Sequence, residues 1–356
     1  MKKRQLILGL VVLVALVALF VYAQRRYPFH WHTFVEQLRL ADWLKIGIGV
    51  GCIYVGYAFR AVRWALLMRH NRKVPLFSLL GTQVIGFTAV ALIGRVADPV
   101  RPYLVSKRTG VPLSTQIAVY IVERLFDFGS MALIISSVIL LAPAGALPHP
   151  EQLRKAGYGG LAITVLAGLF LVAVRVAGGV VASFFEKAFG LVSKKLGEAV
   201  GNKVRAFRTG LDTMRSFSDF AIASTLSLTM WMLITLAYLE TMKAFVASPP
   251  LATMDLPKCI LLLAVSGTAS VFQLPILGWF SQIGFVAAAM ASFYGASPEA
   301  STACAATLLL VTFLSIVPVG LIWARFEHVS LRKITEESGH AGEELAVEEP
   351  VSEETP

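Results

Sequence analysis

Long apolar runs dominate the chain and predict helices that cross a membrane. Each run consists mainly of Leu, Val, Ile, Ala and Phe, and each approaches or exceeds the roughly 20 residues that a helix needs to cross the hydrocarbon core. A membrane barrel would show short alternating segments instead. The pattern therefore predicts an all-α polytopic membrane protein with about six full spans. These predicted spans are residues 6–23, 44–68, 112–141, 158–176, 220–246 and 298–326.

Two shorter apolar stretches contain many small polar residues and are interrupted by Pro and Gly. The first, residues 75–93, leads into a break at residues 94–102 and has basic residues on both flanks. The second, residues 256–274, resumes at residues 285–294 after a break around Gly278. Broken backbone at membrane depth is tolerated only where protein or a wet cavity covers it. We therefore predict two re-entrant helix pairs, the first entering from the cytoplasm and the second from outside.

Glycine spacing relates these two regions. Gly94 is followed sixteen residues later by Gly110, and Gly278 is followed seventeen residues later by Gly295. The second glycine of each pair precedes the Pro- or Ser-rich start of a long span. Because the charge pattern places one break inside and the other outside, we predict an inverted-topology repeat with a substrate site between the breaks, near mid-membrane. The predicted repeat units are residues 44–141 and 220–326.

Composition and charge add the expected partners. The chain is 56% hydrophobic and 15% charged, with a mean hydropathy of +0.70. The net charge is +10, but residues 335–356 hold eight Glu and no Lys or Arg, so residues 1–334 carry 32 basic against 14 acidic side chains. In a membrane protein such an excess marks cytoplasmic loops and contact with anionic lipid, so we expect phospholipids rather than nucleic acid as partners. We predict one transmembrane domain over residues 1–334, cytoplasmic termini, and a disordered acidic tail over residues 335–356.

Residues 181–217 differ from the spans, because Lys and Arg fill the positions between regularly spaced apolar residues. The spacing is helical. It predicts one or two basic amphipathic helices on the inner leaflet, broken near Gly190, Gly197 and Gly201. A cytoplasmic helical hairpin packed on the bundle is the alternative.

Charged residues interrupt the apolar sequence at the first break and in the span that follows it. An ionisable group at membrane depth costs on the order of a few kcal/mol, so such groups pair, reach water or have a function. Arginine presents a rigid fork of donors that suits a phosphate, so we interpret these residues as a site for a lipid head group, with the carboxylates orienting the arginines. A structural polar clamp and a proton relay are the alternatives. The predicted head-group ligands are Arg95, Asp98, Arg101, Glu123, Arg124 and Asp127.

Six other residues are expected to support this site. They are Arg60, Arg63 and Trp64 at the inner end of the second span, Gly94 and Gly278 in the two breaks, and Gln282 after the second break. The cysteines lie in apolar runs and the histidines in loops or at span ends, so we predict no metal site and no cofactor. The sequence contains no Walker, HExxH or GxSxG motif, and we do not expect an enzyme.

Four ordered motifs resemble the lysylphosphatidylglycerol synthase transmembrane-region family. They are FRAVRW at 59–64, GRVADPVR at 94–101, the span start at Gly110–Pro112 and VERLFD at 122–127. The resemblance covers most of residues 40–330, and it implies a flippase-like domain in the inner membrane of a bacterium.

The chain departs from the family pattern in both breaks. Where the first family motif has Pro, Gly and Glu, this chain has Ile93, Ala97 and Asp98. The second family motif ends in a Glu, and the nearest residue here is the neutral Gln282. The soluble aminoacyl-transfer domain of the fused members has no counterpart in the sequence, so we do not expect synthesis of lysyl-phosphatidylglycerol.

The functional prediction is a membrane lipid transporter. It would move a polar or anionic phospholipid, or an isoprenoid-type lipid, between leaflets. The alternative is a non-transporting scaffold that recruits a lipid- or polysaccharide-modifying membrane enzyme through residues 181–217 or through the acidic tail. A third possibility is an intramembrane transferase that uses Glu123 and Asp127.

Overall fold

The structure is a computed structural model. It describes residues 29–69, 73–143, 145–211, 216–269, 277–331 and 333–338. In this part of the chain the regular structure is helical throughout and contains no strand. The predicted first span, residues 6–23, lies outside the described residues.

Six segments of the described chain are long and apolar enough to cross a membrane, which confirms the all-α polytopic fold. They are α3 (Trp43–Met68), α4 (Leu76–Ile93), α6 (Leu113–Leu141), α7 (Pro150–Gly190), α9 (Phe217–Lys243), and the segment Pro298–Phe326. The set differs from the predicted one in two respects: it includes α4, and it lacks residues 6–23, which lie outside the described residues. Helix α4, expected as half of a re-entrant pair, has 18 residues and so measures about 27 Å, close to a full crossing.

The last of these segments is continuous but not uniform. It consists of α13 (Pro298–Leu309), the π-helical turn η3 (Leu310–Leu314) and α14 (Ile316–Phe326). The Ser315 amide donates to the carbonyl of Leu310, five residues back, at 2.7 Å. Pro318 lacks an amide hydrogen and its ring excludes the carbonyl four residues earlier, so a wider turn is a favourable way to continue the helix.

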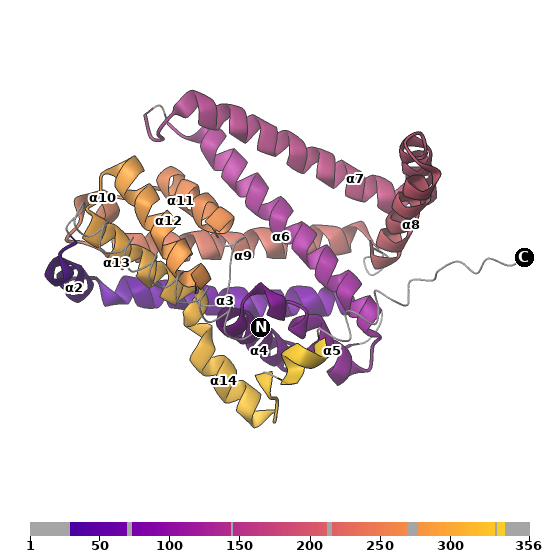
Figure 1. The fold of residues 1–356 in the computed structure, drawn as a ribbon, viewed down its shortest axis with the longest axis horizontal. Coiled ribbons are helices and arrows are strands. Elements are labelled where there is room, and N and C mark those ends of the chain that lie inside the picture. Colours follow the sequence, from indigo (N-terminus) through magenta and orange to yellow (C-terminus); the bar gives the residue numbers. More distant parts are fainter. Residues whose placement is uncertain are drawn as a thin grey trace, which may run out of the picture.

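Helices α3 and α9 form the antiparallel centre of the molecule and run side by side in Figure 1. At one end the Asp42 amide donates to the Ala244 carbonyl at 2.8 Å, and at the other end Arg63 contacts Ser227. Gly49 allows the close approach, because a Cβ atom there would lie only 2.9 Å from the Thr241 hydroxyl. Antiparallel packing is the orientation that an inverted repeat requires of its first helices.

The first hairpin consists of α4, the 3-10 turn η1 (Arg95–Ala97) and α5 (Val100–Thr109). The Arg108 guanidinium donates to the Ser78 carbonyl at 2.8 Å, so the end of α5 returns to the start of α4. Gly94 makes the turn with a φ of 93°, a conformation that glycine adopts without strain. The break ends at Pro99 and is shorter than predicted, because α5 already includes Arg101.

The second hairpin consists of α11 (Leu256–Ala269) and α12 (Leu277–Tyr294). Its helices are also antiparallel, since the Tyr294 hydroxyl donates to the Lys258 carbonyl at 3.3 Å and the Gln282 amide donates to the Ser266 hydroxyl at 2.9 Å. The connection, residues 270–276, lies outside the described residues. Gly278, predicted to lie in the break, belongs to the first turn of α12.

A glycine in the left-handed conformation follows each hairpin. Gly110 has a φ of 67° and Gly295 a φ of 68°, and each is followed three residues later by the first residue of a long helix. Only glycine accepts this conformation readily. Both halves therefore share the order long helix, hairpin, left-handed glycine, long helix.

The largest apolar core lies around the second hairpin, between α9, α11, α12 and α13. Cys259, Met290 and Cys304 are fully buried in it, so both of these cysteines pack as small apolar residues. On the same side of the molecule α2 (Trp31–Arg39) packs on α13, and the short α10 (Pro249–Ala252) follows α9. His30 fixes the start of α2, because its ring Nδ1 lies 3.1 Å from the Glu299 carboxylate.

Helix α7 and α8 (Lys194–Leu211) form a third hairpin. Helix α7 lies apart from most of the α3–α9 pair in Figure 1, whereas Val204 of α8 joins an apolar cluster with Trp64 of α3 and Ala223 of α9. Arg205 of α8 pairs with Glu186 of α7, and a Cβ atom on Gly197 would overlap with the Glu186 carbonyl. Gly197 and Gly201 therefore permit close packing and do not break the helix; only Gly190 ends one. Residues 181–190 are the end of α7, a candidate span, and residues 194–211 form α8, which packs against it.

The end of the described chain packs on the first hairpin. Residues 333–338 are helical, and Ile334 and Ser338 are buried. Ile334 joins an apolar cluster with Ile85 and Leu104. The acidic tail predicted from residue 335 thus begins with a packed turn of helix; residues 339–356 lie outside the described part.

Candidate functional site

A cluster of buried charges lies where α3, α5 and α6 meet. Glu123 and Asp127 are one helical turn apart on α6 and face α3. Arg63 of α3 binds both carboxylates, with distances of 2.8 Å to Glu123 Oε1 and 2.7 Å to Asp127 Oδ1, and it also contacts the Ser227 hydroxyl at 2.6 Å. The Arg63 side chain is only 1% exposed. This guanidinium binds partners through both Nη atoms and fixes α3, α6 and α9 relative to one another.

Arg101 enters the same cluster from α5. Its Nη1 lies 3.2 Å from Glu123 Oε2 and 3.2 Å from Gln83 Oε1. The guanidinium faces the Phe87 ring at 4.4 Å and the Tyr120 ring at 5.0 Å, a favourable position for a cation. Gly86 of α4 provides the space, because a Cβ atom there would overlap with Arg101 Cγ.

Two further arginines lie at the edge of the cluster. Arg124 Nη2 is 2.8 Å from Asp127 Oδ2, and Arg60 Nη1 is 3.3 Å from the same oxygen. We call Arg60, Arg63, Arg101, Glu123, Arg124 and Asp127 the arginine cluster. It holds four positive and two negative charges, an excess of two positive charges.

The arginine cluster is therefore not self-compensated. A buried charge requires a partner, since its desolvation costs several kcal/mol, roughly, in an apolar interior. Nε and Nη2 of Arg101, together with Nε of Arg124, are buried without a hydrogen-bond partner among the described residues. An additional anion beside Arg124 would compensate part of the excess charge and accept from its free Nε.

A cavity of about 310 Å³ lies next to the cluster, between the two hairpins. Its charged wall is formed by Arg60, Arg95, Arg124 and Asp127. Its opposite end is neutral and polar, and the wall between them is largely apolar and aromatic. The neutral polar residues are Tyr238, Ser266, Gln282 and Thr312. The cavity thus has one cationic and one uncharged end.

The predicted ligands occupy different positions relative to this cavity. Arg124 and Asp127 line it, and Arg95 reaches it from η1. Arg101 and Glu123 lie behind this wall and are completely buried. Asp98 is half-buried in the turn before α5 and contributes to the electrostatic field at Arg124.

The predicted supporting residues divide in the same way. Arg60 lines the cavity and Arg63 belongs to the buried part of the cluster. Trp64 packs beside it and donates from its indole nitrogen to the Gln116 side chain at 3.1 Å. Gln282 lines the neutral end, whereas Gly94 and Gly278 shape the backbone and do not line the cavity.

Several residues of the site were not singled out from the sequence. Gln83, Ser227 and Tyr120 each contact an arginine of the cluster, and Tyr238 and Trp231 line the cavity. Gln83 could have been recognised from the sequence, because a side-chain amide inside an apolar helix is costly unless it has a hydrogen-bond partner. The others are ordinary membrane residues, and only the packing of distant helices brings them together.

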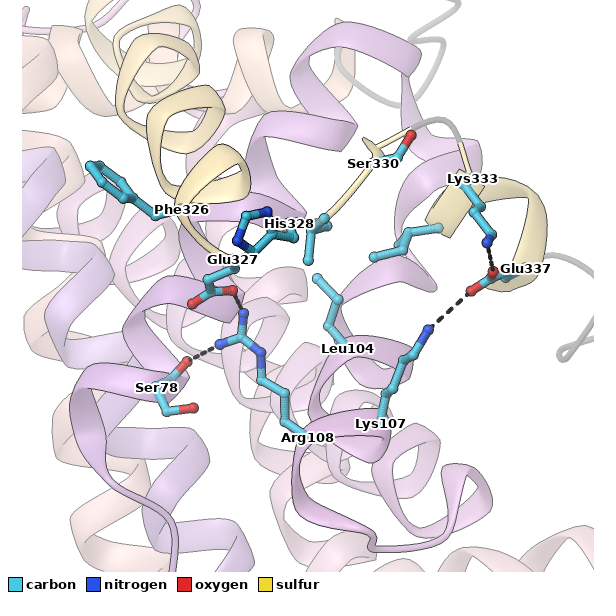
Figure 2. A pocket seen from close by; sticks show the side chains of 12 residues that line it. Ser78, Leu104, Lys107, Arg108, Phe326, Glu327, His328, Ser330, Lys333 and Glu337 are labelled. Carbon is cyan, nitrogen blue, oxygen red and sulfur yellow. Dashed lines mark hydrogen bonds and ion pairs between the residues drawn. The ribbon is translucent and has the colours of Figure 1, made fainter.

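A second cavity, of about 660 Å³, lies between the first hairpin and the end of the described chain (Figure 2). Its charged side chains pair with one another: Arg108 with Glu327, and Lys107 with Glu337 at 3.4 Å. The Tyr103 hydroxyl also donates to Glu337 at 2.9 Å, which lowers the pKa of this carboxyl below its ordinary value. Lys333 also pairs with Glu337, at 3.8 Å, so every Lys, Arg and Glu side chain that lines this cavity is held in an ion pair, and we interpret the cavity as a contact that fastens the chain end to α5.

The fold and the site define a multi-pass helical membrane protein whose interior holds a net-positive charge cluster beside a cavity. Among the described residues, no group of three His, Cys, Asp or Glu side chains could hold a metal ion. The chain belongs to the lysylphosphatidylglycerol synthase transmembrane region family, whose sequence profile matches residues 6–322. The resemblance inferred from the sequence motifs is thereby confirmed. No curated protein and no solved structure matches the chain.

Proposed function

We propose that the protein is a lipid transporter that moves an anionic lipid between the leaflets of a membrane, and that the head group binds in the cavity between the two hairpins. Membership of the family supports a role related to membrane lipids. The observation that favours transport of an anionic lipid is the arginine cluster, with its excess of two positive charges, at the wall of this cavity.

The arginines have distinct tasks in this proposal. Arg60, Arg95 and Arg124 would bind the phosphate, because guanidinium donors match phosphate oxygens and charge-assisted hydrogen bonds are strong. Arg63 and Arg101 would hold Glu123 and Asp127, and these carboxylates would orient the three ligands. Both carboxylates accept bonds from arginines, so we assign them no proton-transfer role and no enzymatic activity.

Transport would follow from alternate exposure of the cavity to the two sides. We propose that both hairpins are re-entrant, that they enter from opposite faces, and that residues 44–141 and 220–326 form an inverted-topology repeat. The antiparallel α3–α9 pair and the two left-handed glycines support this arrangement. Lys107 and Arg108 at the open end of the first hairpin favour the cytoplasmic side of the inner membrane for that end, with both termini in the cytoplasm.

A second candidate function is that of a scaffold for a membrane enzyme. The observation that favours it is the tip of the α7–α8 hairpin. There Leu191 is 90% exposed and Val192 is 78% exposed, beside exposed Lys194 and Lys195. If the protein is a scaffold, the purified protein exchanges no lipid and a lipid- or polysaccharide-modifying enzyme copurifies with it.

The test is leaflet exchange in proteoliposomes. Fluorescent phosphatidylglycerol is placed in both leaflets, the outer label is bleached, and the appearance of inner label outside is followed. Arg124→Gln removes one cavity-facing charge from a side chain that is 28% exposed, so the fold should tolerate it. We expect at least a tenfold slower exchange, against no change for Arg154→Gln on the exposed start of α7. Exchange in the wild type no faster than in empty liposomes, or an unaltered rate in Arg124→Gln, would reject the proposal.

A further inference from the structure

The uncharged end of the cavity is a connected group of hydrogen-bonding side chains. The Tyr238 hydroxyl lies 2.7 Å from the Ser266 hydroxyl, and the Gln282 amide donates to Ser266 at 2.9 Å. All three residues line the cavity. They come from α9, α11 and α12, and we call them the hydroxyl–amide station.

This station lies well away from the arginine cluster. Ser227 of α9 contacts Arg63, and Tyr238 follows eleven residues later on the same helix. At 1.5 Å per residue these backbone levels are about 16 Å apart, and the gap inside the cavity is shorter, because Arg60 and Trp231 line it between the two levels. The antiparallel helix α3 shows the same separation. From Arg63 beside Ser227, its residue numbers fall to Gly56 beside Met230 and Gly49 beside Thr241. A ligand that reaches both ends must therefore be longer than a bare phosphate.

The wall between the two ends also offers a hydrogen bond. Trp231 lies between Ser227 and Tyr238 on α9 and lines the cavity. Its indole Nε1 is buried without a hydrogen-bond partner among the described residues. An indole nitrogen only donates, so this position requires an acceptor atom such as a hydroxyl or ether oxygen.

Among the described residues that line the cavity, nothing at the uncharged end compensates a positive charge. Asp127 is the carboxylate that lines the cavity, and it is already bound by Arg60, Arg63 and Arg124. The excess positive charge of the arginine cluster repels an amine in addition. Hydroxyl groups, in contrast, both donate and accept and so match Tyr, Ser and Gln side chains.

We infer that the substrate is a lipid whose phosphate is joined to an uncharged, hydroxyl-bearing group such as a polyol or a sugar. This inference rests on the proposed transport function and names its substrate class. The phosphate binds Arg60, Arg95 and Arg124, while the hydroxyls bind the hydroxyl–amide station and accept from Trp231. Head groups that end in an amine are excluded by the lack of a free carboxylate and by the positive field.

The test compares three labelled lipids with identical acyl chains in the exchange assay: phosphatidylglycerol, phosphatidate and phosphatidylethanolamine. In the wild type we expect phosphatidylglycerol to exchange at least tenfold faster than phosphatidylethanolamine. Ser266→Ala removes the central hydroxyl of the station without adding volume. It should slow phosphatidylglycerol about tenfold and leave phosphatidate unchanged, because phosphatidate has no hydroxylated group to bind there.

The control is Thr268→Ala on the same helix, which removes an exposed hydroxyl that bonds only within α11 and should leave all three rates unchanged. Equal wild-type rates for phosphatidylglycerol and phosphatidylethanolamine would overturn the inference. So would an equal slowing of phosphatidylglycerol and phosphatidate in Ser266→Ala. In both cases exchange still occurs and the proposed function stands, whereas the absence of any exchange rejects the proposed function itself.

Discussion

The two hairpins have closely similar geometry and opposite chemistry. Each is an antiparallel helix pair that precedes a left-handed glycine and a long helix. The first hairpin contributes Arg95 and Arg101, whereas the second contributes Ser266 and Gln282. The fold therefore places the side chains of both hairpins around one cavity. A few of these side chains make one end of the cavity cationic and leave the other end uncharged.

The same contrast continues in the helices that follow. Aligned on Gly110 and Gly295, the positions of Glu123, Arg124 and Asp127 correspond to Leu308, Leu309 and Thr312. Buried ion pairs fix the first half of the molecule, whereas the second half is held by the apolar core around Cys259 and Met290. Substitutions of the fully buried arginines Arg63 and Arg101 should therefore affect stability and transport together, whereas substitutions in the second half should mainly alter selectivity.

The largest effect is expected for Arg63→Gln. The substitution removes the buried ion pairs of Arg63 with Glu123 and Asp127, and breaking a buried ion pair from one side costs about 3–5 kcal/mol. Thermal unfolding of the purified protein in detergent should show a large fall in Tm. Arg325→Gln, at an exposed position of α14, should show almost none. Equal shifts in both variants would mean that the arginine cluster does not stabilise the first half.

A smaller effect is expected for Gly86→Ala, which pushes Arg101 out of its place beside Phe87. Overpacking of this kind typically costs about 1–3 kcal/mol, and exchange of phosphatidylglycerol should fall roughly tenfold. Gly51→Ala in α3 is the matched control, because no atom lies within 4 Å of the added Cβ. If both alanine variants transport at the wild-type rate, the position of Arg101 does not matter for transport.

Gln282→Glu sharpens the contrast between the two ends of the cavity, because it makes the uncharged end anionic. A carboxylate at the uncharged end would provide the counter-ion that an amine lacks, so exchange of phosphatidylethanolamine should rise relative to phosphatidylglycerol by about fivefold, corresponding to roughly 1 kcal/mol. The ratio should stay constant in Gln152→Glu on exposed α7. An unchanged ratio in Gln282→Glu would show that this end does not contact the head group.

The smallest effect concerns Glu337. Its pKa is lowered by the Tyr103 hydroxyl and by Lys107 and Lys333, so the contact stabilises the chain end above the ordinary pKa of a carboxyl and is lost as the pH falls through the lowered value. Hydrogen exchange of residues 333–338, corrected for the intrinsic rate, should rise below about pH 4. Glu337→Gln should show the faster exchange already at neutral pH. Exchange that is independent of both pH and substitution would contradict this role.

Much of the fold follows from the sequence, because apolar length and glycine spacing are local signals. The i, i+4 pair Glu123 and Asp127 was predictable on the same ground. Their main partner Arg63 was one of several candidates, since pairing between helices depends on tertiary packing. Arg101 was expected in the break; Pro102, which is tolerated in a first helical turn, was the local indication that α5 had already begun.

The hairpin of α7 and α8 shows a different limit of prediction from the sequence. The apolar spacing predicted helices, but the same amphipathic face can cover a membrane surface or a neighbouring helix. Gly197 and Gly201 were expected to break the helix, and they instead allow close contact with Glu186. The sequence around a glycine does not show whether the glycine ends a helix or allows close packing. The difference depends on whether a residue of another helix approaches it.

The location of the head group is the central claim, and photocrosslinking tests it most directly. A phosphatidylglycerol with a photoreactive head group is reconstituted with the full chain, illuminated, and mapped by mass spectrometry. We predict adducts on cavity residues such as Phe87, Met131 and Trp231, and a loss of these adducts in Arg124→Gln. Adducts confined to the cavity beside Lys107 and Phe326, or to the exposed α7–α8 tip, would contradict binding between the two hairpins.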